Sequence, residues 1–298
     1  MIKKYYFSKL LPNYHILYIK NTKYPEFSLF SASKCQFHIM KIFKIIFRFF
    51  FSIYGFLVFV LLMLLLFPLF IYAFLQKPVK GGNLIYTISR VWADLFFFLT
   101  AIRHWNIYEE QHDKNIEYIF VSNHISYLDI PMMMKVIRGQ HIRILGKAEM
   151  NKIPLFGSIY KRGTVSVDRE NAKARSKSVH QLISFIHKKI SVFICPEGTF
   201  NKTNHPLKSF YNGAFKIAIE TQKPIRPILF LDTYDRLNYN SIFSLNPGKS
   251  RGVYLAQTPT QGLTLQDLPV LKEKIYKQME EALVRYKASW IKESQEDN

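Results

Sequence analysis

Residues 118–129 read Tyr-Ile-Phe-Val-Ser-Asn-His-Ile-Ser-Tyr-Leu-Asp, and this stretch decides the fold. Its first four residues form an apolar, β-rich run, which is typical of a buried strand. A polar turn with Asn123 and His124 follows, and the Ser-x-x-Asp spacing of Ser126 and Asp129 is typical of a helix start. A strand that passes through a polar turn into a helix is the building unit of α/β sheets.

The same alternation continues along the chain. Further β-rich runs lie at residues 142–145, 164–167, 190–194, 225–231 and 252–255. Between them, residues 172–188 and 214–220 have apolar side chains at helical spacing, and residues 268–292 form a last amphipathic pattern that Asp267 is placed to cap. Strands that alternate with helices predict an α/β fold in which helices cover both faces of the sheet.

The N-terminal part has a different composition. Residues 49–75 contain no charged side chain, and as a helix they would extend about 40 Å, against about 30 Å of bilayer hydrocarbon. Basic residues dominate residues 1–48, so the positive-inside tendency keeps the N-terminus cytoplasmic, and a single crossing would place the rest of the chain outside. Pro68 and a second apolar patch at residues 91–102 offer an alternative, because the patch could form a hairpin with the first segment or lie in the interface.

These patterns predict three parts of the chain. Residues 1–39 show no sustained periodicity, so we expect a poorly structured extension. Residues 40–105 are expected to form a membrane anchor and residues 106–298 the α/β domain, which would be the catalytic domain if the candidate residues described below act as an enzyme site. We also expect translation in the cell to begin at Met40, and peptides from residues 1–39 in mass spectra of the native protein would contradict this expectation.

Composition narrows the class of partner. The chain has 298 residues, an apolar fraction of 49% and a formal net charge of +20. This charge predicts attraction to anionic membranes, phosphorylated substrates or nucleic acid. The basic residues are spread over the whole chain and no nucleic-acid-binding module is recognisable, so we expect no nucleic-acid partner. Cys35 and Cys195 lie far apart and lack the spacing of metal ligands, so we expect no metal site.

His124 and Asp129 are the candidate catalytic residues. His124 directly follows a predicted strand, where α/β sheets usually present such residues. A separation of five residues is about 140° around a helix, so the side chains meet only if His124 stays in the turn and Asp129 lies in the first helical turn. The carboxylate would then fix the imidazole tautomer and leave the other ring nitrogen to accept a proton from a hydroxyl. Alternatively, Asp129 only begins the helix and His124 is an ordinary loop residue.

Two later segments carry candidate binding residues. Lys147 and Arg169 flank glycine-containing bends and suit phosphate binding, although runs of charge more often form a solvated surface. In the segment Pro196-Glu197-Gly198-Thr199 an apolar strand ends and turns at a glycine. Such a turn either offers free N–H groups to a substrate or simply ends the strand.

A fourth segment contains Pro224 and Pro227 within an apolar strand. We expect these prolines to shape an acyl-binding wall and not to react. In order and separation, the four segments resemble the glycerolipid acyltransferases of the 1-acylglycerol-3-phosphate acyltransferase type. The patterns that carry the resemblance are Asn-His-x-x-x-x-Asp, Val-x-Val-Asp-Arg, Pro-Glu-Gly-Thr and Pro-Ile-x-Pro-Ile, within roughly residues 85–260. The family implies a mixed, largely parallel sheet flanked by helices.

The resemblance also implies a role for each matching residue. His124 would be the general base and Asp129 its orienting partner. The residues implied in binding the substrate phosphate are Lys147, Arg169, Glu197, Gly198 and Thr199. Those implied in acyl-donor binding or local structure are Asn123, Pro224 and Pro227.

The reaction implied is transfer of a fatty acyl group from acyl-CoA or acyl-carrier protein to the free hydroxyl of 1-acylglycerol-3-phosphate, giving phosphatidic acid without a cofactor. The expected partners are membrane lipids, the lysophospholipid acceptor and the acyl donor. The expected location is the bacterial inner membrane, with the catalytic domain facing the cytoplasm.

Phe200 departs from the family pattern, because many members have a basic residue directly after Pro-Glu-Gly-Thr. An acyltransferase acting on another lysolipid, such as an amino-lipid, is therefore an alternative. A serine hydrolase is disfavoured because the chain has no Gly-x-Ser-x-Gly elbow. A non-catalytic lipid-binding protein would give no reason for His124 and Asp129 in order with the later segments.

Overall fold

The computed structural model describes residues 25–153, 156–168 and 171–291, with side chains from residue 39 onward except that of Ala172. The chain divides into two units, Met1–Ile46 and Phe47–Asn298, and the second contains the sheet. The helices are α1 (Pro25–Leu75), α2 (Pro78–Leu99), α3 (Asp129–Val136), α4 (Phe156–Gly163), α5 (Ala172–Ile186), α6 (Gly213–Thr221), α7 (Thr233–Arg236) and α8 (Leu268–Arg285), with 3-10 turns η1 (Ala148–Lys152) and η2 (Leu265–Asp267). The strands are β1 (Ile102–Tyr108), β2 (Ile119–Ser122), β3 (Ile142–Lys147), β4 (Thr164–Val167), β5 (Ser191–Ile194), β6 (Ile225–Phe230) and β7 (Gly248–Tyr254).

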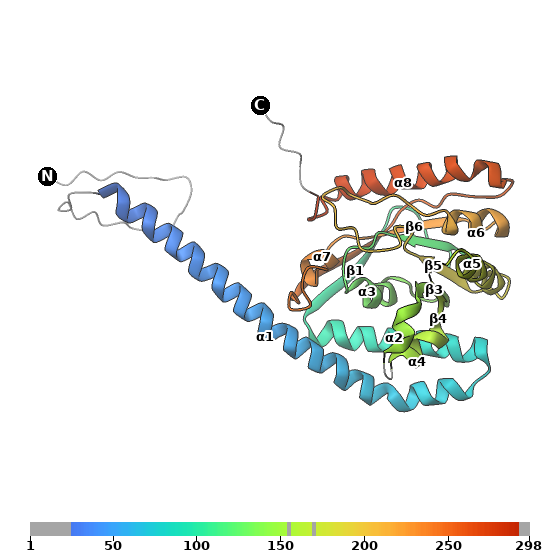
Figure 1. Ribbon diagram of the computed structural model, residues 1–298, viewed down its shortest axis with the longest axis horizontal. Coiled ribbons are helices and arrows are strands. Elements are labelled where there is room, and N and C mark those ends of the chain that lie inside the picture. Colours follow the sequence, from blue (N-terminus) through green and yellow to red (C-terminus); the bar gives the residue numbers. More distant parts are fainter. Residues whose placement is uncertain (1–24, 154–155, 169–170, 292–298) are drawn as a thin grey trace. The chain divides into compact units, whose positions relative to one another are not determined.

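These strands form one sheet in the order β1-β7-β6-β2-β5-β3-β4 (Figure 1). Strands β6, β2, β5, β3 and β4 run parallel, whereas β7 is antiparallel to β6 and pairs in parallel with β1. The mixed, largely parallel sheet confirms the predicted fold class. Because the carboxyl ends of parallel strands meet at one edge, the turns after β2, β3, β4 and β5 all lie on that edge.

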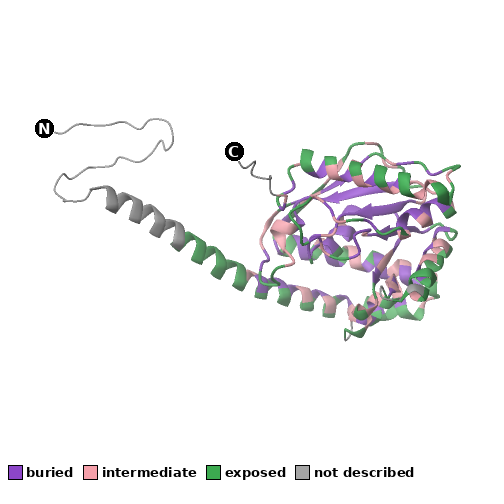
Figure 2. Cartoon of the chain, turned by 45° about the horizontal axis from the view of Figure 1, so that its top comes forward, coloured by how far each residue is buried: buried purple, intermediate pink, exposed green. Residues whose placement is uncertain are grey.

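Helices cover both faces of the sheet. Side chains alternate along each strand, so each strand contributes to the core on both faces. In β2, Phe120 belongs to a core that includes residues of α2 and α3, whereas Ile119 and Val121 belong to a core that includes residues of α5, α6 and α8. Every residue of β2 and β5 is buried (Figure 2). Continuous burial is what central strands with two covered faces require.

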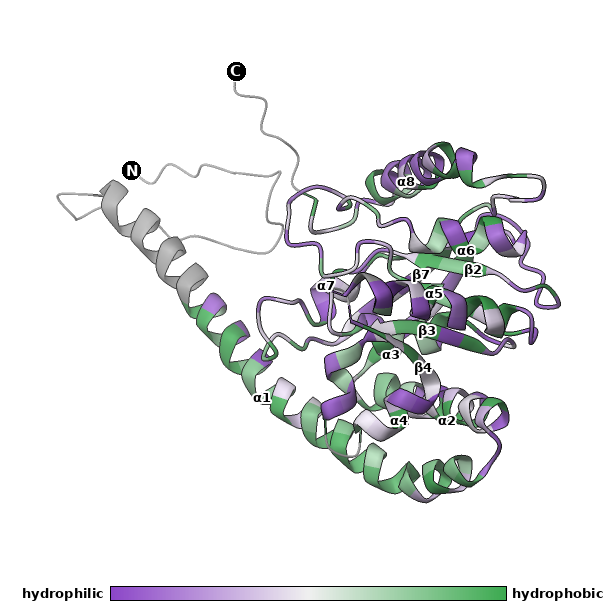
Figure 3. Cartoon of the chain, turned by 45° about the vertical axis from the view of Figure 1, so that its right-hand side comes forward, coloured by the Kyte–Doolittle hydropathy of each residue, from purple (hydrophilic) through white to green (hydrophobic). Residues whose placement is uncertain are grey.

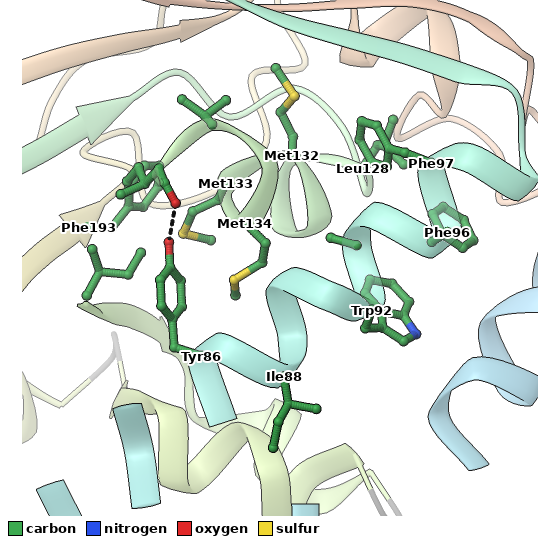
Figure 4. Close-up of a cluster of buried hydrophobic side chains, with 14 of the residues drawn as sticks. Tyr86, Ile88, Trp92, Phe96, Phe97, Leu128, Met132, Met133, Met134 and Phe193 are labelled. Atoms are coloured by element: carbon green, nitrogen blue, oxygen red, sulfur yellow. Dashed lines mark hydrogen bonds between the residues drawn. The ribbon is translucent and has the colours of Figure 1, made fainter. Parts of the chain in front are cut away.

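Helix α2 contributes an aromatic face to the first core. Trp92 and Phe96 stack with ring centroids 5.2 Å apart, and the methionines of α3 pack in the same core (Figure 4). The buried hydroxyl of Tyr86 donates to the carbonyl of Ile137 at 3.0 Å. The patch at 91–102 therefore lies mostly in α2 and supplies buried side chains, although Phe98 is 80% exposed.

The second half of helix α1 contains no charged side chain and is mostly hydrophobic in the view of Figure 3. Buried residues recur at four-residue spacing on one side and belong to the first core, as Val58, Leu62, Leu66 and Phe70. The other side exposes large side chains, such as Leu65 at 65%. Among the described helices, α1 alone is long and apolar enough to span a membrane, over Ile39–Leu75.

Some boundaries differ from the sequence prediction. Strand β1 was not predicted, because its polar and half-buried sequence resembles a loop, and it lies at the sheet edge beside β7.

Helix α8 ends at Arg285, short of the predicted residue 292. Asp267 does precede α8, but its carboxylate accepts from Thr264 in a capping box of the preceding 3-10 turn. Of the predicted extension at 1–39, residues 1–24 lie outside the described residues, and α1 begins at Pro25.

Candidate active site

The turn between β2 and α3 holds His124 against Asp129. Asp129 is the first residue of α3, and its Oδ2 lies 2.9 Å from His124 Nδ1. The same oxygen accepts from the backbone N–H groups of Ile125 at 2.8 Å and Ser126 at 2.9 Å. The side chain of Asp129 is 3% exposed and that of His124 is 21% exposed. The carboxylate is thus fixed by the backbone, and the structure places the two residues as the sequence geometry required.

This contact decides which ring nitrogen of His124 can act as a base. An ionised carboxylate only accepts hydrogen bonds, so the proton on the imidazole lies on Nδ1. Nε2 then carries the free lone pair. A half-buried imidazole with a fixed tautomer can remove a proton from a hydroxyl placed against Nε2.

Glu197 joins this turn to the loop after β5. Its Oε1 accepts from the backbone N–H of His124 at 2.8 Å, and its Oε2 accepts from the backbone N–H of Lys208 at 2.9 Å. The residue is 1% exposed. Burial raises the pKa of Glu197 to about 8, although the two N–H bonds act in the opposite direction. Because both oxygens are engaged by backbone groups, we propose that Glu197 positions the two loops instead of contacting the substrate phosphate.

Gly198 allows the tight turn that follows Glu197. Its φ of 74° lies in the left-handed region that favours glycine. A Cβ at this position would lie 2.7 Å from a ring carbon of Tyr211. The next residue, Thr199, is exposed, and its hydroxyl accepts from the Lys208 ammonium at 2.8 Å.

Phe200 contacts the turn between β2 and α3, which carries His124 and is called the catalytic turn below because it holds the candidate base. Its ring centroid lies 4.4 Å from that of His124, and the next residue, Asn201, donates its N–H to the His124 carbonyl at 2.7 Å. The Tyr127 ring meets Phe200 edge-on at 5.0 Å, and the Tyr239 ring stacks on it at 6.2 Å. An aromatic wall therefore borders the imidazole.

The residues predicted for acyl-donor binding or local structure, Asn123, Pro224 and Pro227, lie within the sheet. The buried amide of Asn123 accepts from the N–H of Phe230 at 2.8 Å and donates to its carbonyl at 3.1 Å, which ties the ends of β2 and β6 together. The Pro224 carbonyl accepts from the N–H of Ile119 at 3.0 Å, and Pro227 lies buried inside β6. Of the two roles predicted for these residues, their contacts favour local structure over acyl-donor binding.

Lys147 lies on the same sheet edge as His124, at the last position of β3. Its side chain is 55% exposed and its ammonium lies 3.2 Å from Glu149 Oε1. The register pairs Lys147 with Val167 at the end of β4, so both strands end level. Arg169 follows two residues later and lies outside the described residues. Phosphate binding by Lys147 and Arg169 stays a prediction.

Known proteins are similar to this chain in sequence or in fold. A sequence model described as Acyltransferase matches residues 104–231. The human 1-acyl-sn-glycerol-3-phosphate acyltransferase alpha is 29% identical over 160 residues, which cover 53% of this chain and 56% of the human protein. A 1-acyl-sn-glycerol-3-phosphate acyltransferase of Cocos nucifera is 34% identical over 131 residues, which cover 43% of this chain and 42% of that protein. The crystal structure of the 1-acyl-sn-glycerophosphate acyltransferase PlsC from Thermotoga maritima matches with a TM-score of 0.67 and 18% identity, over 84% of this chain and 100% of that one.

These matches support the family predicted from the four motifs, the 1-acylglycerol-3-phosphate acyltransferase family of glycerolipid acyltransferases, over residues 104–231. At 18% identity, the Thermotoga maritima structure shows the fold alone. The chain spans about half the length of the curated relatives it matches.

The candidate active site also contains residues to which the motifs assigned no role. Lys208 reaches it from the loop after β5, and Tyr239 from the loop after α7. The latter loop is tied to the catalytic turn, because the Ser126 hydroxyl donates to the carbonyl of Leu237. No local pattern signals these contacts, because they join segments that only the folded sheet brings together.

Proposed function

We propose that this protein transfers a fatty acyl group from an acyl thioester to the free hydroxyl of 1-acylglycerol-3-phosphate, which gives phosphatidic acid. The observation that carries the proposal is the His124–Asp129 pair at 2.9 Å on the carboxyl edge of the sheet. The names of the human and Cocos nucifera relatives, both 1-acyl-sn-glycerol-3-phosphate acyltransferases, support this choice of acceptor. We propose acyl-CoA or acyl-carrier protein as the donor.

The proposed step begins when His124 Nε2 accepts the proton of the acceptor hydroxyl. The hydroxyl oxygen attacks the thioester carbonyl carbon, and a C–O bond forms. The tetrahedral intermediate then collapses with cleavage of the C–S bond. The leaving thiolate takes the proton from the imidazolium, which returns His124 to its starting state. Asp129 holds Nδ1–H in place and stabilises the imidazolium between the two proton transfers.

All proton transfers in this step use His124, so the proposal includes no cofactor and no metal, and the acyl donor enters as a co-substrate. Membrane lipids and the lysophospholipid acceptor are the proposed partners. The acceptor and the product carry acyl chains, so a membrane location brings the site to its substrates.

We further propose that the protein is anchored in a bacterial inner membrane with its catalytic domain facing the cytoplasm. The exposed apolar side of α1 supports anchoring, because large apolar side chains are unfavourable in water. The buried side of α1 supports a shallow or hairpin arrangement over a simple crossing, since Phe59 packs edge-on against Trp92 of α2 at 5.0 Å.

Phe200 favours a second candidate function, acylation of another lysolipid such as an amino-lipid. Its ring is tilted against that of His124, at a position where a cation would suit a phosphate. A panel of lysolipid acceptors, each supplied with acyl-CoA and then with acyl-carrier protein, separates the two candidates. Preference for 1-acylglycerol-3-phosphate supports the first proposal, and preference for an uncharged or amino head group supports the second.

Substitution of the base tests the mechanism. His124→Ala should lower kcat by about 10²–10⁴-fold or more, because it removes the group that accepts the hydroxyl proton. His180→Ala, on the exposed side of α5, is the matched control and should retain full activity. Turnover of labelled acceptor by purified protein in detergent is the measurement. Wild-type turnover by His124→Ala would exclude the proposed mechanism.

A further inference from the structure

The Pro-Glu-Gly-Thr turn contains no cation of its own. Residues 195–200 read Cys-Pro-Glu-Gly-Thr-Phe, and the only charged side chain among them is the buried Glu197. Phe200 follows with its ring against His124. A positive charge for an anionic substrate at this turn must therefore come from another segment.

Lys208 supplies a positive charge at the turn. Its ammonium donates to Thr199 Oγ1 at 2.8 Å, and its backbone N–H donates to Glu197 Oε2 at 2.9 Å. The residue is thus held at both ends and is half-buried. Because the other oxygen of Glu197 accepts from the His124 N–H at 2.8 Å, a single carboxylate links the backbones of the base and of Lys208.

The ammonium of Lys208 has unused donors. Within the part of the chain that the structure describes, no carboxylate forms an ion pair with it, whereas Lys147 pairs with Glu149 at 3.2 Å. An ammonium has three N–H donors, and Thr199 takes one of them. The remaining two suit an oxyanion, since hydrogen bonds between an ammonium and a phosphate are short and strong.

We propose that Lys208, oriented by Thr199, binds the phosphate monoester of the acceptor beside His124. This assignment rests on the proposed function and names the group that recognises its acceptor. Lys208 acts as a binding residue, and Thr199 positions its ammonium. Phe200 carries no charge and packs against His124, so Lys208 is the residue that recognises the charge of the phosphate.

Lys208→Met tests the assignment with little disturbance of the fold. Methionine keeps the backbone N–H that bonds Glu197 and removes only the ammonium. Lys208→Arg is the conservative variant, and Lys216→Met, a surface lysine paired with Glu220 on α6, is the matched control. Thermal unfolding of each variant checks that the fold is retained.

The kinetic measurement uses 1-acylglycerol-3-phosphate and acyl-CoA with the purified full chain in detergent. Loss of one charged contact with phosphate should raise the acceptor KM about tenfold to a hundredfold, with the donor KM within about twofold of wild type. Lys208→Arg should recover most of the loss, and Lys216→Met should match wild type. An unchanged acceptor KM, or an effect confined to the donor, would overturn the proposal.

A binding measurement without donor separates this proposal from the proposed function. Lys208→Met should weaken equilibrium binding of labelled 1-acylglycerol-3-phosphate but not of 1-acylglycerol, which lacks the phosphate. That difference supports the site even if the wild type transfers no acyl group, and equal weakening of both lipids would overturn it. Inorganic phosphate should displace the lipid only at far higher concentration, and displacement at equal concentration would assign the site to free phosphate instead.

Discussion

Glu197 determines how two loops of the site meet. Its carboxylate accepts one N–H from the catalytic turn and one from the Lys208 loop, and it does so while almost completely buried. Burying the carboxyl without these hydrogen bonds would lower the free energy of unfolding. Leaving either backbone N–H without its acceptor would lower it as well. The residue thereby links the position of the base to that of the proposed phosphate site.

Glu197→Gln is the sharpest test of this linkage. Glutamine has nearly the same shape, but its amide nitrogen cannot accept, so one of the two N–H groups loses its partner. We expect a loss of about 1–3 kcal/mol in the free energy of unfolding and a clear decrease in kcat. Denaturant unfolding and turnover measure the two effects, with Glu220→Gln on the surface of α6 as the control. A variant as stable and active as wild type would show that the bridge is dispensable.

The raised pKa of Glu197 also predicts how the stability lost in Glu197→Gln depends on pH. Burial raises the pKa of Glu197 from 4.5 in the unfolded chain to about 8 in the folded protein. The folded protein therefore binds the proton more tightly, and this contribution to stability is complete below about pH 4.5 and is lost as the pH rises through about 8. The stability of the wild type should thus fall relative to that of Glu197→Gln as the pH rises between these values, and a constant difference would contradict the raised pKa.

At the scale of elements, the loop of residues 237–245 connects α1 with the site. At one end, the carbonyl of Leu237 accepts from Ser126 in the catalytic turn. At the other, the N–H of Leu245 donates to Ser52 Oγ of α1 at 3.0 Å, and the Phe243 ring lies 5.1 Å from that of Phe49. The loop therefore joins α1 to the turn that carries His124 through direct contacts.

Gly55→Val should disturb this connection. A Cβ on Gly55 would lie 2.2 Å from Leu245 Cδ2, and Leu245 is 3% exposed, so the loop must repack. Overpacking of this kind costs about 1–3 kcal/mol, which should appear as a lower Tm. Gly213→Ala is the control, because the nearest atom to its Cβ lies 4.0 Å away. Equal Tm values for the two variants would show that the loop adapts freely.

At the scale of the whole molecule, two forces attract the protein to a membrane. One is the formal net charge of +20, and the other is the exposed apolar side of α1. They differ in their response to salt, because molar salt screens charges beyond about 3 Å but does not weaken apolar burial. The extraction behaviour of the protein therefore reports which force holds it.

We expect the full chain to stay in the membrane fraction in about molar salt and to be released by detergent, because α1 is apolar enough to enter the bilayer. Immunoblots of the washed and extracted membranes provide the measurement, with a peripheral membrane protein as the control. Release by salt alone would show that charge is the main attachment and would contradict the proposed anchor.

Much of this architecture follows from local sequence. Short β-rich runs predicted every strand of the sheet except β1, whose polar and half-buried sequence resembles a loop. The contact between His124 and Asp129 was also predictable, because five residues of strand-turn-helix geometry determine where both side chains lie. In contrast, the patch at 91–102 gave no sign of whether its apolar residues contact lipid or protein.

By itself, the sequence determined the α/β pattern and the apolar segment and predicted the contact of His124 with Asp129, since each depends on neighbours along the chain. Only the tertiary structure decided that Glu197 is a bridge, that Phe200 lies on the imidazole and that Lys208 reaches Thr199. The physical reason is the strand order, which places β5 next to β2 although some seventy residues separate their turns. Contacts across that distance depend on which strands pair, and no local periodicity encodes that choice.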